Sequence, residues 1–221
     1  MEKYYICRLY QHNTVIYIMQ MERGQRTKEK IILEAFKLFA IKPYEKVTFV
    51  DIENAVGLSR GAILYHYKTK ESIFLAVVRK YIFERVSVDE IYYKDPQICL
   101  GAFISAFIDM CKKEKKEMAS IGISNVNSAI LNIELSAFFV FPELLQEAFE
   151  WHYREVRLLK KVVENAIRVG EIRSDFDVEV LLRLFLAVFL GTSFEGMAYP
   201  KGYNLDVLDT DFRMLYDFVK K

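Results

Sequence analysis

The side chains with the clearest chemical capacity lie together in the stretch VGLSRGAILYHYKTKESIF, residues 56–74. Arg60 carries a guanidinium group, which can donate two parallel hydrogen bonds to guanine O6 and N7 or bind a phosphate oxygen. Tyr65 offers a hydroxyl group to phosphate and a flat ring for packing. Lys68 and Lys70 add positive charge at the far edge of the same segment. This set of side chains is suited to a polyanion with accessible base edges.

Short-range signals predict the elements that hold these side chains. Thr48 with Asp51 three residues later resembles a capping box with Asp in place of Glu, so a helix is expected over about 49–55. Gly57 supplies the φ angle of a tight turn, and Ser59 can cap a further helix. Because only three or four residues separate the two helices, the spacing is that of a helix-turn-helix. The second of these helices would point its free N–H groups and positive dipole end outward, where a phosphate binds or a base edge is recognised.

The first turn of that helix carries two residues with very small side chains. Gly61 and Ala62 add almost no bulk, which lets the backbone approach a duplex, although Gly61 could equally serve a close helix crossing. Ile63 and Leu64 are expected to hold the helix to its neighbours. His66 either faces the DNA or packs at the junction with the following helix, and we keep it among the candidate DNA contacts.

The remaining pattern is helical throughout, without the alternation of strands. Apolar residues from Ile31 to Phe39 recur at three- and four-residue steps, which indicates an amphipathic helix that ends at Pro43. Thr69 is expected to cap a fourth helix that runs to about Arg85. Beyond Pro96 the composition predicts long helices over about 97–115, 118–140, 143–169, 177–197 and 206–219.

The segment TFVDIENAVGLSRGAILYHYKTKESI resembles the TetR family of bacterial transcriptional regulators over about residues 27–75. The matching positions are Thr48, Ile52, Ala55, Gly57, Leu58, Ser59, Gly61, Tyr65, His66, Tyr67, Thr69, Lys70 and Glu71. Departures are mild: Tyr67 stands where Phe is usual, Thr69 where Ser is usual, and Leu64 where a second Tyr is frequent. The last of these removes one potential phosphate contact.

This resemblance implies specific roles. Thr48, Tyr65 and Lys70 would contact phosphate, and the turn from Ser59 to Ala62 would contact bases. It also implies a homodimer on a palindromic operator in double-stranded DNA, and a helical C-terminal domain with a pocket for a small-molecule effector. The candidate DNA-binding residues are therefore Thr48, Ser59, Arg60, Gly61, Ala62, Tyr65, His66 and Lys70.

The C-terminal part supplies candidates for the pocket and the interface. The segment 180–190, VLLRLFLAVFL, is apolar almost all round and must be covered on most sides, so a subunit interface is expected. Aromatic side chains would suit a pocket between helices, although at helical spacing they also fill ordinary cores. His152, on an apolar stripe, could instead be a hydrogen-bonded core or interface histidine. The pocket candidates are Phe103, Phe107, Phe138, Phe149, His152 and Phe185, and the interface candidates are Leu159, Val163, Leu182, Phe185 and Phe189.

Charge separates the chain into parts with different tasks. Residues 23–70 hold ten Lys/Arg against five Asp/Glu, a net charge of +5, whereas the rest holds 21 against 25, a net charge of −4. Such asymmetry favours a basic surface for a polyanion joined to a part with another task. The fold class expected is all-α, with a three-helix helix-turn-helix DNA-binding domain at 23–70 and a helical-bundle effector-binding and dimerisation domain at 71–221.

Other features limit the class of protein. Cys7, Cys99 and Cys111 lack the paired spacing of a zinc site, so we expect free thiols in the cytoplasm, no metal and no cofactor. The longest apolar run is too short to span a membrane. Met19 and Met21 stand just before the basic segment, so residues 1–22 are expected to be an extra arm or a translation-start artefact.

The function expected from the sequence is a ligand-responsive, site-specific DNA-binding regulator, most readily a repressor released by a small apolar molecule. One alternative is a constitutive DNA-binding protein without an effector. Another is a helical enzyme or lipid-handling protein that keeps the helix-turn-helix as scaffold. The enzyme alternative is disfavoured because no nucleophile stands near a base and no glycine-rich phosphate loop is present, so the chain is not expected to be an enzyme.

Overall fold

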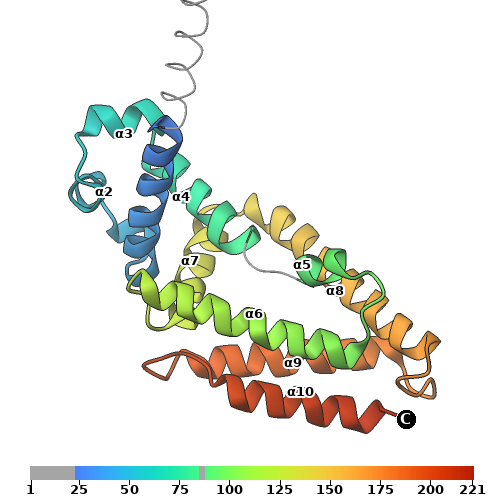
Figure 1. Ribbon diagram of the computed structural model, residues 1–221. Coiled ribbons are helices and arrows are strands. Elements are labelled where there is room, and N and C mark those ends of the chain that lie inside the picture. Colours follow the sequence, from blue (N-terminus) through green and yellow to red (C-terminus); the bar gives the residue numbers. More distant parts are fainter. Residues whose placement is uncertain (1–22, 85–87) are drawn as a thin grey trace, which may run out of the picture.

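The computed structural model describes residues 23–84 and 88–221, which form helices joined by short turns (Figure 1). A basic N-terminal unit lies at one end of the molecule, and a longer helical body extends away from it. The elements are the first helix (residues 23–41), η1 (Tyr44–Lys46), α2 (Phe49–Val56), α3 (Arg60–His66), α4 (Lys70–Val78), η2 (Arg79–Phe83), α5 (Val88–Lys94), α6 (Leu100–Ser120), α7 (Val126–Val140), α8 (Leu144–Arg168), α9 (Val178–Gly196) and α10 (Leu205–Val219). Here η1 is a 3₁₀ turn and η2 a π-helical turn.

Side-chain caps set the start of each helix around α3, as the sequence predicts. The backbone N–H of Thr48 donates to Asp51 Oδ2 (2.8 Å), and the N–H of Asp51 donates back to Thr48 Oγ1 (3.1 Å), so the expected capping box is confirmed. Gly57 ends α2 with φ +69°, in the left-handed region. Ser59 Oγ accepts from the N–H of Ala62 (3.4 Å) and begins α3. The helix-turn-helix is thus specified locally.

The core of the N-terminal unit extends further than residue 70. The Phe39 and Phe74 rings meet edge to face with centroids 4.8 Å apart, and Phe36 stacks on Tyr81 at 3.8 Å. Ile73 and the other inward residues of α4 are fully buried. Because α4 packs on the first helix, we define the N-terminal unit as residues 23–78 and the helical body as residues 88–221.

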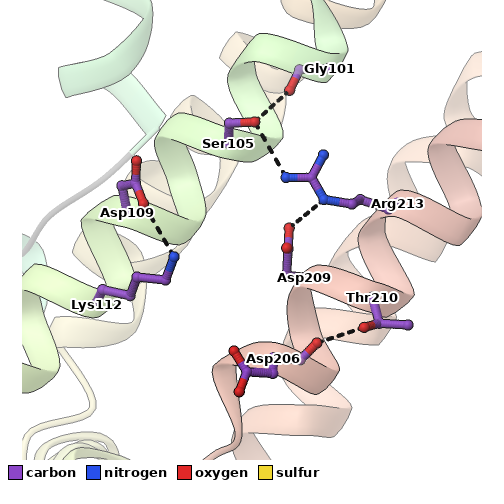
Figure 2. A network of polar contacts seen from close by, with 8 residues as sticks. All are labelled: Gly101, Ser105, Asp109, Lys112, Asp206, Asp209, Thr210 and Arg213. Atoms are coloured by element: carbon purple, nitrogen blue, oxygen red, sulfur yellow. Dashed lines mark hydrogen bonds and ion pairs between the residues drawn. The ribbon is translucent and has the colours of Figure 1, made fainter.

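Long helices of the body run side by side, and α6, α9 and α10 lie along one edge of it (Figure 1). Figure 2 shows how α10 is tied to α6: Arg213 Nη2 donates to Ser105 Oγ (3.5 Å) while its Nε pairs with Asp209 (3.0 Å). One turn earlier on α6, the Glu171 carboxylate accepts from the N–H groups of Leu100 (2.9 Å) and Gly101 (3.0 Å). These contacts hold the first two turns of α6 on its neighbours.

The body departs from the sequence prediction at one helix boundary. A break was expected near 116, but α6 continues to Ser120 because the run KKEKKEMAS has no breaker and suits a helix. The chain turns instead at Gly122, where φ is +92°, and Asn125 caps α7. The short helix α5 was not predicted as a separate element.

Two hydrogen bonds join the body to the N-terminal unit through α7. Asn132 Nδ2 donates to the Phe39 carbonyl oxygen (2.7 Å), which lies in the last turn of the first helix. The backbone N–H of Tyr44 donates to Ser136 Oγ (3.2 Å), and the Tyr44 ring meets Phe141 at 5.0 Å. A third link lies directly after α4, where Nε of Arg79, the first residue of η2, pairs with Glu147 of α8 (3.1 Å). The N-terminal unit is therefore held to the body by non-covalent contacts as well as by the covalent connection along the chain.

The expectation of an arm at residues 1–22 concerns a segment outside the described ranges. Within residues 23–84 and 88–221, none of the helices combines the length and the apolar character needed to cross a lipid bilayer.

The two glycines around α3 predict opposite effects on stability. Gly57 has φ +69° and open space where a Cβ atom would stand, so Gly57→Ala should lower the free energy of unfolding by about 1 kcal/mol through backbone strain alone. Gly61 is helical with similar open space, so Gly61→Ala should leave stability unchanged or raise it by up to about 1 kcal/mol. Urea unfolding of both variants checks this. Equal destabilisation by both would contradict the assignment of strain to Gly57.

Candidate DNA-binding site and internal cavity

The outer surface of α3 presents the residues expected to contact DNA. Ser59, Arg60 and Gly61 are exposed in its first turn, and Tyr65, one turn after Gly61, is 78% exposed. Ile63 is fully buried and holds the helix to the unit, as expected. Thr48, at the start of α2, is also exposed. The first turn of α3 thus has exposed backbone with little side-chain bulk above it.

Arg60 has partners within the unit. Its Nε donates to Glu53 Oε1 (2.8 Å), and its Nη2 approaches Oε2 at 3.5 Å. The guanidinium carbon also lies over the Phe49 ring, 5.2 Å from the centroid. Both partners belong to α2, so α2 determines where the Arg60 side chain points.

His66 occupies the junction between helices. Its side chain is half-buried and lies beside Gly24 of the first helix. A Cβ atom added to Gly24 would be 4.0 Å from the Cε1 atom of His66. Burial, and then the positive charge of Lys28, lower the pKa of His66 below its usual value. This location favours the packing alternative, in which a neutral imidazole fills the space between α3 and the first helix.

Lys70 is directed inward, which differs from the phosphate contact implied by the family resemblance. Its ammonium group donates to the carbonyl oxygens of Tyr44 and Val47 (2.9 Å each) and lies 3.9 Å from the centroid of the Tyr44 ring. Burial lowers the pKa of Lys70. Because two of its donors serve the chain itself, Lys70 acts here as a clamp across the base of the helix-turn-helix.

A cavity of about 160 Å³ lies within the helical body. Its wall is mostly apolar, and Glu114, Glu155 and His152 are among its polar side chains. Glu155 Oε2 accepts from the backbone N–H of Val88 (2.6 Å), which ties α8 to the start of α5. Of the pocket candidates, four line the cavity: Phe103, Phe107, His152 and Phe185. A space of this size holds a molecule of roughly the dimensions of one aromatic ring.

The other two pocket candidates lie elsewhere. Phe138 packs half-buried against the hydrophobic core, and Phe149 is 63% exposed on α8, where it stacks on Tyr153 at 6.3 Å. The buried residues of α8 include Leu144, Glu155 and Leu158, and Phe149 is not among them. Trp151, another aromatic residue of α8, also lines the cavity.

The interface candidates also need correction. Leu159, Val163, Leu182 and Phe185 are buried within the single chain, and Phe189 packs half-buried on Phe107 with ring centroids 5.4 Å apart. These side chains fill the body or line its cavity, so they offer little surface to a partner. Other apolar side chains of the last two helices are exposed: Val180, Leu184 and Phe194 on α9, and Val207, Met214 and Phe218 on α10.

Sequence reasoning missed Glu53 and Phe49 as partners of Arg60, and Asn132 and Ser136 as contacts of the N-terminal unit. A signal exists for Glu53, since the tight turn at Gly57 brings the last turn of α2 beside the first turn of α3; Phe49 lies one turn earlier in α2. The α7 contacts join residues more than ninety positions apart and have no local signature.

Comparison with known proteins agrees with this architecture. Residues 31–77 match the protein family described as "Bacterial regulatory proteins, tetR family". The HTH-type transcriptional repressor BepR of Brucella suis biovar 1 is 22% identical over 183 residues, which are 81% of this chain and 84% of BepR. The HTH-type transcriptional repressor Rv1474c of Mycobacterium tuberculosis is 38% identical over 53 residues, which are 24% of this chain and only 28% of that protein.

A solved structure extends the similarity to the fold of the body. The transcriptional regulator, TetR family, from Cytophaga hutchinsonii has a TM-score of 0.63 at 20% identity, covering 90% of this chain and 96% of that one. The all-helical fold with an N-terminal helix-turn-helix is therefore confirmed. The matching proteins are transcriptional regulators, in agreement with the prediction that the chain is not an enzyme.

The inward position of Lys70 predicts that it stabilises the fold and contributes little to phosphate binding. Lys70→Met should lower the free energy of unfolding by about 2 kcal/mol, because two hydrogen bonds to a charged donor are lost. The exposed Lys68 is the matched control, and Lys68→Met should leave stability unchanged while reducing the salt dependence of DNA binding by about one ion. Thermal unfolding and binding at several salt concentrations test both. If Lys70→Met instead reduced the salt dependence of DNA binding and left stability unchanged, the result would support a phosphate contact by Lys70.

Proposed function

Because the chain belongs to the TetR family of bacterial regulatory proteins, we propose that it is a cytoplasmic repressor, a homodimer that binds a palindromic DNA site and leaves it when a small apolar molecule enters the body. The observation that carries this proposal is the first turn of α3, where capped, exposed backbone stands beside Arg60 with no bulky side chain over it. Such a helix enters the major groove with its N-terminal residues at base edges.

The DNA contacts divide by chemistry. Ser59, Arg60, Gly61 and Ala62 face base edges, where a guanidinium group discriminates guanine and small residues allow close approach. Thr48 and Tyr65 offer exposed hydroxyl groups to phosphate on either side of the groove. This assignment leaves His66 and Lys70 out of the DNA contacts, because their side chains make contacts between helices within the N-terminal unit.

The homodimer is supported by the exposed apolar surface of α9 and α10. Leu184 and Phe194 on α9, with Met214 and Phe218 on α10, are all more than two fifths exposed in the single chain. A face of this kind on adjacent helices is typical of a subunit interface. A dimer pairs two copies of α3 for half-sites about 34 to 36 Å apart, or a multiple of that distance.

The cavity supports the effector half of the proposal. An apolar cavity that remains in a close-packed interior is open to a ligand of matching size. A ligand weakens DNA binding when it binds better to a dimer whose two α3 helices are wrongly spaced. The path runs along α8, whose Trp151 and His152 line the cavity and whose Glu147 pairs with Arg79, the residue directly after α4 (3.1 Å). A constitutive DNA-binding protein without an effector has no use for this cavity.

The function is tested by binding of the purified protein to DNA that flanks its own gene, in a salt titration. Saturable binding to one palindromic site is expected, with affinity that falls steeply as salt rises. Arg60→Ala should cost about 1 to 3 kcal/mol on that site and relax its sequence preference, whereas Tyr65→Ala should weaken all DNA binding. Equal weak binding to every fragment would argue against a site-specific regulator.

The effector is sought on the same complex, with Trp151 as reporter. Trp151 is the only tryptophan of the sequence and lines the cavity, so a bound small aromatic or aliphatic compound should change its fluorescence. The same compound should release the operator at matching concentrations. Cys111→Phe, which puts a ring on the cavity wall, should abolish both responses and leave operator binding intact.

The interface proposal predicts a monomer when charge is placed on the α9 face. Phe194→Glu should shift the mass measured by light scattering from dimer to monomer, because two carboxylates would be desolvated at the interface. Phe139 of α7 is similarly exposed, and Phe139→Glu is the matched control that should stay dimeric. If Phe139→Glu dissociates the dimer and Phe194→Glu does not, the interface lies on α7.

A further inference from the structure

The guanidinium group of Arg60 is held in place before any DNA arrives. It has three edges, and the side edge formed by Nε and Nη2 faces the Glu53 carboxylate (2.8 and 3.5 Å). The Phe49 ring lies against its face at 5.2 Å. The Arg60 side chain remains 56% exposed, while that of Glu53 is 19% exposed. The carboxylate therefore lies beneath the guanidinium group, mostly shielded from solvent.

This arrangement leaves one donor edge free. The end edge of Arg60 carries one N–H of Nη1 and one of Nη2, and neither is used by Glu53. Two parallel N–H groups are what guanine O6 and N7 accept in the major groove. The contact with Glu53 is thus compatible with base recognition by Arg60.

We infer that Glu53 is a positioning residue that holds Arg60 for base recognition and thereby contributes to sequence specificity. This inference rests on the proposed function. A free arginine loses rotamer freedom when it binds a base, and a side chain already held by Glu53 and Phe49 has lost much of it beforehand. This smaller loss of rotamer freedom raises affinity only where Arg60 meets its correct base, because random DNA offers no base that accepts from the guanidinium group in its fixed orientation.

The charge of Glu53 has a second consequence. With Arg60 present, the carboxylate is neutralised by a bidentate partner next to the DNA surface. Removal of Arg60 alone leaves an anion there, which repels phosphate on every DNA sequence. Arg60→Ala by itself therefore combines a loss of base recognition with an unrelated loss of general affinity.

A double-mutant cycle of Glu53→Gln, Arg60→Ala and the double variant separates these effects, measured on the best operator and on random DNA. Glu53→Gln should lower operator affinity about two- to tenfold and leave random-DNA affinity unchanged or higher. In the Arg60→Ala background, Glu53→Gln should cause no further loss on the operator and should raise affinity for random DNA. The two substitutions should therefore be coupled in the ratio of operator to random-DNA affinity.

A control variant tests whether loss of any carboxylate has this effect. Glu34 pairs with Lys37 at 2.9 Å, has a side chain 23% exposed, and belongs to the first helix. Glu34→Gln should leave the operator-to-random ratio unchanged. Thermal unfolding of each variant shows that the comparison is made between folded proteins.

Each outcome has a defined meaning. If the unmodified protein prefers no DNA sequence, the proposed function fails, and the role of Glu53 fails with it. If it binds an operator but Glu53→Gln keeps the full preference, only the role of Glu53 is wrong. Tighter operator binding by Glu53→Gln would show that Glu53 withholds Arg60 from DNA, which also overturns the inference.

Discussion

The placement of the helix-turn-helix depends on one half-buried cation, the ammonium group of Lys70. The ammonium group of Lys70 joins the carbonyl oxygens of Tyr44 and Val47, which precede α2, to the start of α4, which follows α3. An ammonium group taken out of water is costly unless its donors are satisfied, so these bonds and the Tyr44 ring define a single arrangement. The hydrogen bond from Lys70 to Val47 closes the intervening chain into a loop. Within that loop, the caps at Thr48 and Ser59 determine where α2 and α3 begin.

Features set by neighbours in sequence could be predicted from it. The capping box at Thr48, the left-handed Gly57 and the cap at Ser59 depend on residues at most three positions apart, and all three are confirmed. The helical class of the body follows from the apolar period, because a 3.6-residue repeat leaves no other regular element. The same signals brought Ser59, Arg60 and Gly61 to one exposed turn.

Features set by distant partners could not be predicted in this way. A lysine at a helix start has the same local sequence whether it faces solvent or the carbonyl oxygens of Tyr44 and Val47, so the inward turn of Lys70 required the fold. Periodicity identifies an apolar stripe but not what covers it. The pattern therefore predicts Leu182 and Phe185 at a subunit interface, whereas both are buried within the single chain and Phe185 lines its cavity.

The contacts of α7 have a consequence for the mechanics of the molecule. The N-terminal unit is joined to the body at η2, where Arg79 also pairs with Glu147 of α8, and again where Asn132 and Ser136 contact Phe39 and Tyr44. With these two regions as fixed places, the motion of the unit that keeps its contacts is rotation about the line between them. Any swing of α3 that keeps both fastenings must therefore follow one arc, so displacement of the body is converted into a motion of fixed direction.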